Sequence, residues 1–299
     1  MTTTIPQFDD ISVSTKTIIG VSNLTIPISE LYQVLSVEKY VVIPKKRGRQ
    51  KKIYREDPNK DLEEGSIITL KYQDECRGVD LNAKKNKKKK TLTKKKFFRN
   101  ALTVVMKVDN KLINFKISKN GKFQMTGVKY DEQAVKCIKY FWNKLKNTKY
   151  SQETISITFI NVMTNIDFNV GFIINRENLD KHMNSLENFN SLLETSFGYT
   201  GVNIKFPLRD EIEMDLPTLS YDGENWSESI TKYSDYLETL PDDARFKEEA
   251  KKRYNTFLVF HSGNVIMSGM IPKYMKPVFN KFVDIIKNAR KDIEEKLDI

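Results

Sequence analysis

The sequence has few of the residues that catalysis and metal binding use most. Among its 299 residues are only two cysteines, Cys76 and Cys137, and two histidines, His182 and His261. Two cysteines are too few for a disulfide framework or a four-ligand zinc site, so a reducing compartment fits best. A phosphate-binding P-loop, a G-x-G-x-x-G fingerprint and an H-E-x-x-H motif are missing as well. The sequence therefore predicts a protein that is not an enzyme and that has neither a cofactor nor a metal.

Long apolar runs are also missing. No stretch approaches the ~18–20 apolar residues of a membrane-spanning helix. Residues 1–6 lack the basic start and apolar core of a signal peptide. Hydrophobic residues nevertheless make up 39% of the chain and aromatic residues 11%, which is enough for a substantial core. We therefore expect a folded protein of one large domain or two ordinary ones, away from membranes.

Charge is unevenly distributed along the chain. The net charge is +11, but residues 45–52 and 84–96 alone hold 15 basic residues and no acid, which leaves 35 basic against 39 acidic residues elsewhere. Residues 208–252 are instead predominantly acidic, with 13 acidic and six basic residues. Segments of this composition are typical of solvated insertions or long loops. We therefore expect a basic insertion over 44–96 and an acidic insertion over 208–252, both outside the core.

Two halves of the chain carry the same short pattern, 142 residues apart. One half has NGKFQMTGVK and the other SGNVIMSGMI, with glycines at matching positions. Strand-like runs at 111–118 and 255–261 precede them, so the first glycine of each suits a hairpin turn. Amphipathic spacing predicts a helix after each pattern, over 131–146 and near 278–293. The sequence therefore predicts an α+β fold with a pseudo-twofold repeat.

These patterns resemble the TATA-box-binding protein family, and more closely its divergent members from giant DNA viruses. In that family an apolar-apolar-Phe-x-Ser-Gly-Lys hairpin is followed by a strand, by Thr-Gly-Ala-Lys and by a long helix. The second half here reads LVFHSGN and then MSG; the first reads INFKIS, NGK and then MTGVK, with a hairpin about one residue longer. The resemblance covers residues 14–43 with 97–148 and residues 154–207 with 253–295.

The resemblance implies a saddle, in which a curved antiparallel sheet carries helices on its convex face. Residues 1–148 would form the first repeat, with the basic insertion 44–96. Residues 149–299 would form the second, with the acidic insertion 208–252. The implied function is a transcription initiation factor that binds and bends A/T-rich promoter DNA in the minor groove. Its implied partners are a factor-IIB-like protein and RNA polymerase, its implied state a monomer or weak dimer, and its location the nucleus, a viral factory in the host cytoplasm, or the virion.

The resemblance also implies apolar wedges that enter the DNA. Phe260 aligns with the hairpin Phe of the second repeat, and Tyr199 lies at the neighbouring wedge position. In the first repeat, Phe115 or Ile117 takes the hairpin position, and Phe98 lies just before the last one. Ordinary core packing is the alternative for these residues.

Further residues match polar positions of the family. Those at base-edge positions are Asn161, Thr17, Thr126 and Ser268. Those at phosphate-contacting basic positions are Lys107, Lys122 and Lys205. The chain departs from the family pattern at Thr17, Ala101, Tyr199 and Asn264.

The basic insertion has a pattern of its own. Arg47-Gly48-Arg49 resembles an AT-hook, in which glycine lets the backbone approach a narrow A·T minor groove where arginine meets enhanced negative potential. The lysine run at 84–96 would neutralise phosphates without reading sequence. A solvated loop or a nuclear-import signal is the alternative for both segments.

A second function remains open at this point. The chain could keep the saddle fold, lose sequence-specific DNA binding, and act in interactions or in virion assembly. The acidic insertion could in turn regulate DNA binding by competing for the basic segments or for the saddle.

Overall fold

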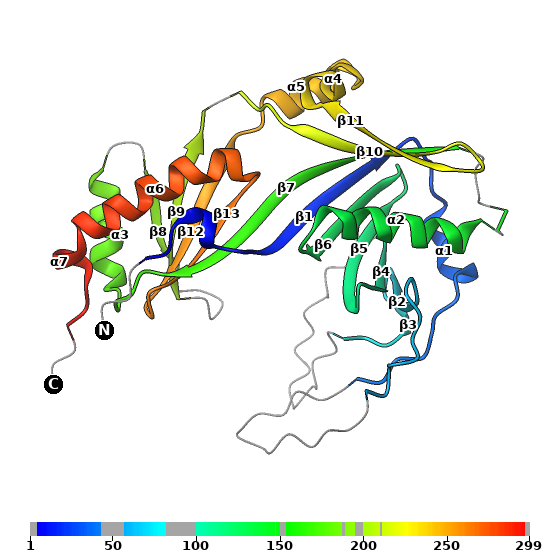
Figure 1. Ribbon diagram of the computed structural model, residues 1–299, viewed down its shortest axis with the longest axis horizontal. Coiled ribbons are helices and arrows are strands. Elements are labelled where there is room, and N and C mark those ends of the chain that lie inside the picture. The colour runs from blue at the N-terminus through cyan, green and yellow to red at the C-terminus, as the bar shows by residue number, and fades with distance from the viewer. Residues whose placement is uncertain are drawn as a thin grey trace. The chain divides into compact units, whose positions relative to one another are not determined.

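The structure, a computed structural model, describes residues 5–42, 57–81, 100–146, 148–149, 154–186, 189–194, 200–209 and 211–296. The chain divides into two compact units. Unit 1 consists of Met1–Thr17, Asn161–Leu216 and Ile230–Ile299, and unit 2 of Ile18–Ile160 and Pro217–Ser229. Both combine helices with antiparallel strands (Figure 1), which confirms the predicted α+β class. The division into repeats at residue 148 stays a prediction.

Four strands contribute residues to both units: β1 (Val13–Ser22), β7 (Ile155–Asn169), β10 (Asp215–Tyr221) and β11 (Trp226–Lys232). The elements confined to unit 2 are α1 (Ile28–Val34), β2 (Ile67–Tyr72), β3 (Glu75–Gly78), β4 (Ala101–Val108), β5 (Lys111–Ser118), β6 (Lys122–Val128) and α2 (Asp131–Leu145). Those confined to unit 1 are the 3₁₀ turn η1 (Phe8–Asp10), α3 (Arg176–Ser185), β8 (Asn190–Glu194), β9 (Gly201–Leu208), α4 (Tyr233–Glu238), α5 (Asp242–Glu249), β12 (Arg253–Phe260), β13 (Asn264–Gly269), α6 (Pro272–Asn288) and α7 (Arg290–Ile293).

In unit 2 the strands follow the order β3-β2-β4-β5-β6, each antiparallel to its neighbour. Alternate residues point to one face, where Val104, Phe115 and Met125 are paired across three strands and fully buried. Helix α2 packs on this face (Figure 1), with the ring of Phe141 edge-on to Phe115 at 6.0 Å. The helix predicted over 131–146 is thus confirmed to within one residue, because its apolar spacing matches the face that it buries.

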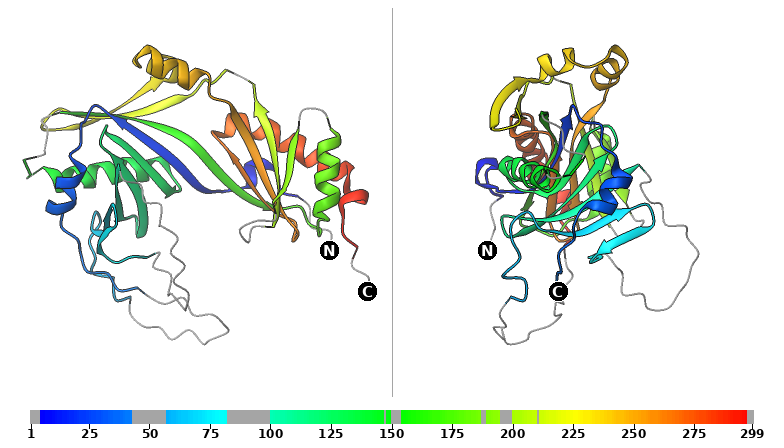
Figure 2. Two further views of the ribbon diagram at one scale, coloured as in Figure 1. Left: turned by 180° about the vertical axis from the view of Figure 1, so that it is seen from behind. Right: turned by 90° about the vertical axis from the view of Figure 1, so that its right-hand side faces the viewer.

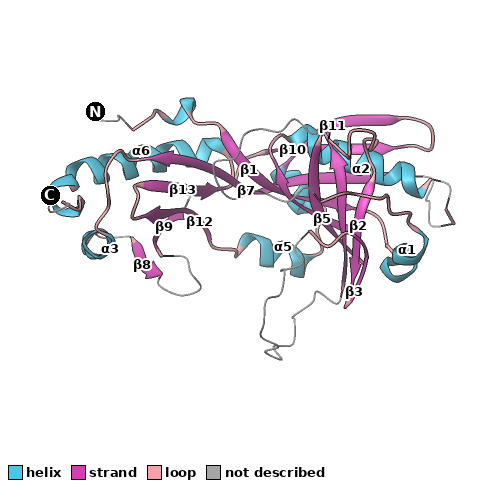
Figure 3. Ribbon diagram, turned by 90° about the horizontal axis from the view of Figure 1, so that it is seen from below, coloured by secondary structure: helices cyan, strands magenta, loops and turns pink. Residues whose placement is uncertain are grey.

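In unit 1 the order is β7-β13-β12-β9-β8, again antiparallel throughout, and Figure 3 shows β13, β12, β9 and β8 side by side. Ile204, Phe257 and Met267 are paired across β9, β12 and β13 and are fully buried. Helix α6 covers them (Figure 2), and the ring of Phe282 stacks on Phe257 at 4.0 Å. α6 begins at Pro272, earlier than the spacing predicts.

The two charged segments do not lie wholly outside the core, and that expectation is wrong. Strand β2, inside the basic segment 44–96, pairs with β4 and buries Ile67 and Leu70. The acidic segment 208–252 contains β10, β11, α4 and α5, and its Leu219 and Tyr221 belong to the core of unit 2. Short apolar stretches inside a highly charged segment are enough to form strands, because one face of a strand needs only every second residue to be apolar.

Within the part of the chain that the structure describes, no helix is both long enough and apolar enough to cross a membrane.

Candidate nucleic-acid interface

The hairpins β5–β6 and β12–β13 have the same turn. Each turn has three residues and ends in a glycine, Gly121 with a φ of 70° and Gly263 with a φ of 77°. A Cβ atom at Gly121 would lie 2.4 Å from the Leu24 carbonyl oxygen, and one at Gly263 would lie 2.3 Å from that of Phe172. Both positions therefore require glycine. The expected extra residue in the first hairpin is not present.

Counting back from these glycines changes the alignment of the first hairpin. Ser118 accepts a hydrogen bond from the Gly121 N–H through its backbone oxygen at 3.2 Å, and Phe260 accepts the equivalent one from Gly263 at 3.0 Å. Ser118 in the first hairpin is thus structurally equivalent to Phe260 in the second. By the same count Phe115 is equivalent to Phe257, a core residue.

The wedge prediction is accordingly wrong for Phe115 and Ile117. Both side chains are 0% exposed and lie on the face that α2 covers. An apolar ring that is already packed against Phe141 has no surface to offer to DNA. Core packing is the correct interpretation of both residues.

Phe260 lies on the opposite face of its strand. Asn255, Phe257 and Val259 of β12 are buried, and Phe260 is out of phase with them and half-buried. Its partner on β9 is Gly201, which has no side chain to cover the ring. The geometry does not contradict a wedge role for Phe260, which stays a prediction. Tyr199 and Phe98 lie outside the described residues.

Four polar side chains lie side by side on the same face of unit 1. We call them the polar row, and they are Asn165 of β7, Ser268 of β13, Thr256 of β12 and Lys205 of β9. The Ser268 hydroxyl donates to Asn165 Oδ1 at 2.7 Å, and Asn165 Nδ2 donates to Thr15 Oγ1 at 3.2 Å. Lys205 is exposed at the end of the row. Amide, hydroxyl and ammonium groups are the usual contacts to base edges and phosphates.

The sequence predicts a base-edge contact at Asn161, whereas the structure places Asn165 beside Ser268. Asn161 Nδ2 donates to Thr164 Oγ1 at 2.9 Å, and this hydroxyl in turn donates to the Met270 carbonyl oxygen at 2.8 Å. Asn161 Oδ1 is buried without a hydrogen-bond partner among the described residues. The structure therefore does not bring Asn161 to Ser268, and its base-edge role stays a prediction.

The remaining predicted contacts lie in different environments. Thr17 is 9% exposed, too little for a base-edge contact, so that prediction is wrong. Thr126 is exposed and donates to the Asn114 carbonyl oxygen at 3.2 Å. Lys122 is exposed, whereas the Lys107 ammonium donates to the Leu62 carbonyl oxygen inside unit 2. Arg47 and Arg49 lie outside the described residues.

The two cysteines differ in exposure, Cys76 being exposed and Cys137 buried. Burial raises the pKa of the Cys137 thiol to about 12, which keeps it protonated and unreactive. Among the described residues, no three His, Cys, Asp or Glu side chains are grouped closely enough to hold a metal ion.

Comparison with known proteins gives a viral relative. No family model matches the chain. Uncharacterized protein 335L of Invertebrate iridescent virus 6 is 31% identical over 214 residues, which make up 66% of this chain and 62% of that protein. The match thus spans less than two thirds of that relative's length. A solved structure, Methanococcus jannaschii TBP, superposes with a TM-score of 0.44 at 13% identity, over 93% of this chain and 98% of that one.

Proposed function

We propose that this chain is a TATA-box-binding-like transcription initiation factor that binds A/T-rich duplex DNA in the minor groove and bends it. The observation that supports this proposal is the face of unit 1 on which Phe260 and the polar row lie together. The minor groove of an A·T pair presents only acceptors, which amide and hydroxyl donors can meet. Lys205 adds a phosphate contact, and an apolar ring at the end of the face can enter between base pairs.

The wider proposal follows the sequence resemblance. Residues 1–148 and 149–299 act as the two repeats of a saddle, with helices on its convex side. The chain works as a monomer or weak dimer, without catalysis or cofactor, and recruits a factor-IIB-like protein and RNA polymerase. It acts in the nucleus or in a viral factory, or is carried in the virion.

Ser118 favours a second candidate function. One hairpin carries a small hydroxyl at the place where the other carries Phe260, so one end lacks an apolar ring. A protein of this fold that serves interactions or virion assembly, without sequence-specific DNA binding, needs no such ring.

A DNA-bending assay separates the two functions. Two duplexes of equal length, one A/T-rich and one G/C-rich, carry a fluorophore pair at their ends, and energy transfer reports the bend. The factor should bind and bend the A/T-rich duplex preferentially. Phe260→Ala should reduce the bend and weaken binding roughly tenfold, equivalent to about 1.4 kcal/mol.

The matched control is Phe246→Ala, because Phe246 is an exposed phenylalanine on helix α5 of the same unit and lies on none of the strands that carry the polar row. This variant should bend DNA nearly as the unchanged protein does. Equal affinity for both duplexes without bending would instead support the assembly function.

A further inference from the structure

Helices α4 and α5 form a pair of short helices that contributes little to the core. They are joined by residues 239–241, and none of the eight residues of α5 is buried. Phe246, in the middle of α5, is 72% exposed, more than any other large apolar side chain that the structure describes. Figure 2 shows both helices, in yellow and gold, standing apart from the strands of unit 1. Folding alone does not require Phe246 to be apolar.

The helix pair is nevertheless held firmly where the chain leaves it. Arg253, the first residue of β12, donates through Nη2 to Glu248 Oε1 of α5 at 2.7 Å and to the Tyr233 hydroxyl of α4 at 2.8 Å. Tyr233 is 4% exposed, and its backbone N–H donates to the Met214 carbonyl oxygen at 3.0 Å. One half-buried arginine thus ties both helices to the sheet.

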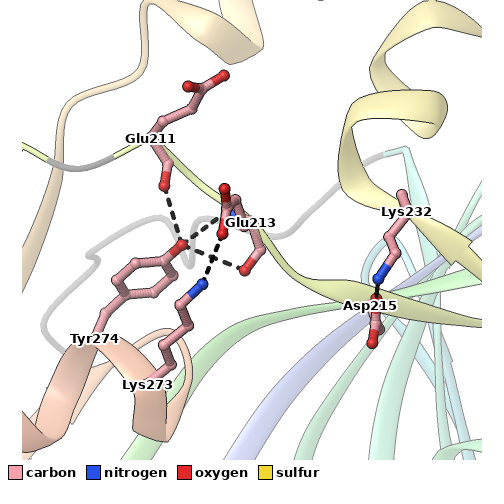
Figure 4. A network of polar contacts seen from close by, with 6 residues as sticks. All are labelled: Glu211, Glu213, Asp215, Lys232, Lys273 and Tyr274. Atoms are coloured by element: carbon pink, nitrogen blue, oxygen red, sulfur yellow. Dashed lines mark hydrogen bonds and ion pairs between the residues drawn. The ribbon is translucent and has the colours of Figure 1, made fainter.

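The segment before β10, to which the start of α4 is hydrogen-bonded, is also held, as Figure 4 shows. The Tyr274 hydroxyl of α6 accepts from the Glu213 N–H at 2.7 Å and donates to the Glu211 carbonyl oxygen at 3.0 Å. Lys273 Nζ, beside it, lies 2.8 Å from Glu213 Oε2. Attachment through Arg253 and through the segment before β10 gives the two helices a fixed position, although α5 buries nothing. An exposed aromatic side chain on a helix of fixed position suits a binding surface, because the helix itself need not be ordered on binding.

Charge indicates what could cover this surface. Residues 233–249 contain six acids and two basic residues, in a chain whose net charge is +11. Arg245 is paired with Glu249 at 2.9 Å and Glu248 with Arg253 at 2.7 Å, so the acidic excess rests on the other four acids, Asp235, Glu238, Asp242 and Asp243. Such a surface repels a phosphate backbone and attracts a basic protein surface. Aromatic side chains in the middle of an interface usually fill a pocket and supply much of the binding energy.

We propose that α4 and α5 dock on a partner protein whose surface is basic around an apolar pocket, and that the ring of Phe246 fills this pocket. The surface is separate from the polar row and from Phe260. The proposal therefore stands or falls independently of DNA binding.

A basic amphipathic peptide serves as the probe. The peptide is a labelled helix with lysine on one face and leucine on the other, and a second peptide has glutamate in place of lysine. Fluorescence anisotropy with the full chain should show binding of the lysine peptide only, weakening with added salt because exposed charges are screened. Phe246→Ala should weaken this binding roughly tenfold without changing the thermal unfolding midpoint, since the side chain is exposed.

The matched control is Leu192→Ala. Leu192 is 63% exposed on β8 of the same unit and lies outside the acidic segment, so this variant should bind the lysine peptide unchanged. Equal binding by Phe246→Ala, an equal loss in Leu192→Ala, or equal binding of the glutamate peptide would each overturn the proposal. None of these results would bear on the DNA-bending assay.

Discussion

The hairpins β5–β6 and β12–β13 share their turn and their buried residues but differ on the other face. Phe115 packs on Phe141 in unit 2, and Phe257, at the matching place in unit 1, packs on Phe282. On the opposite face Ser118 stands where the other hairpin has Phe260. The same hairpin backbone and a similar core thus accept different residues on the exposed face. The two surfaces therefore need separate tests.

The largest expected effect concerns the shared core. Phe115→Ala and Phe257→Ala should each lower the free energy of unfolding by about 3–5 kcal/mol, because each removes a fully buried ring. Phe260→Ala should cost only about 1–2 kcal/mol, because its ring is half-buried. Urea unfolding of the three variants measures this contrast. If Phe115→Ala cost no more than Phe260→Ala, the assignment of Phe115 to the core would be wrong.

The second test gives the first hairpin the ring that it lacks. If Phe260 acts as a wedge, Ser118→Phe should increase DNA bending and strengthen binding to the A/T-rich duplex by roughly three- to tenfold, through one more inserted ring. Ser118→Ala is the control, because it removes the same hydroxyl, which accepts from the Lys122 N–H at 3.1 Å, without adding a ring. A bend unchanged by Ser118→Phe would show that the two hairpin ends are not equivalent towards DNA.

The sequence was sufficient to predict the elements that follow a regular spacing. The α+β class, the turn glycines and helix α2 could all be predicted, because glycine at positive φ and a 3.6-residue apolar spacing each leave a local signature. The wedge prediction at Phe115 is wrong because the phenylalanine nearest to the turn is not the residue that matches Phe260. Three residues before Gly121, the matching residue is Ser118.

The polar row could not be predicted in full, for a different physical reason. Along β7 the buried side chains fall on odd positions up to Phe159 and on even positions from Thr164 onward. A change of phase within one strand turns every later side chain to the other face. In the sequence the apolar residues also change phase between Phe159 and Ile166, but the apolar residues in between obscure the exact place, so the sequence alone does not single out Asn165. The hydrogen bonds of Arg253 to α4 and α5 could not be predicted from the sequence either, because they join residues whose contact depends on the tertiary fold.

The smallest expected effect concerns the first residue of each hairpin, where β12 has Arg253 and β5 has Lys111, which is exposed. Arg253 donates a hydrogen bond to the Tyr233 hydroxyl. Burial raises the pKa of Tyr233 to about 12, above the usual value near 10. Because the folded state holds this proton more tightly than the unfolded state, the proton's contribution to stability is complete below pH ~10 and is lost as pH rises from ~10 through ~12.

Tyr233→Phe should therefore lower the free energy of unfolding by about 1 kcal/mol at pH 7. Above pH ~10 the free energy of unfolding of this variant should decline less steeply than that of the unchanged protein. Urea unfolding at a series of pH values measures this, with Tyr130→Phe, an exposed tyrosine of unit 2, as the control that should follow the unchanged protein. Parallel declines of the unchanged protein and Tyr233→Phe would show that the burial of Tyr233 does not hold this proton.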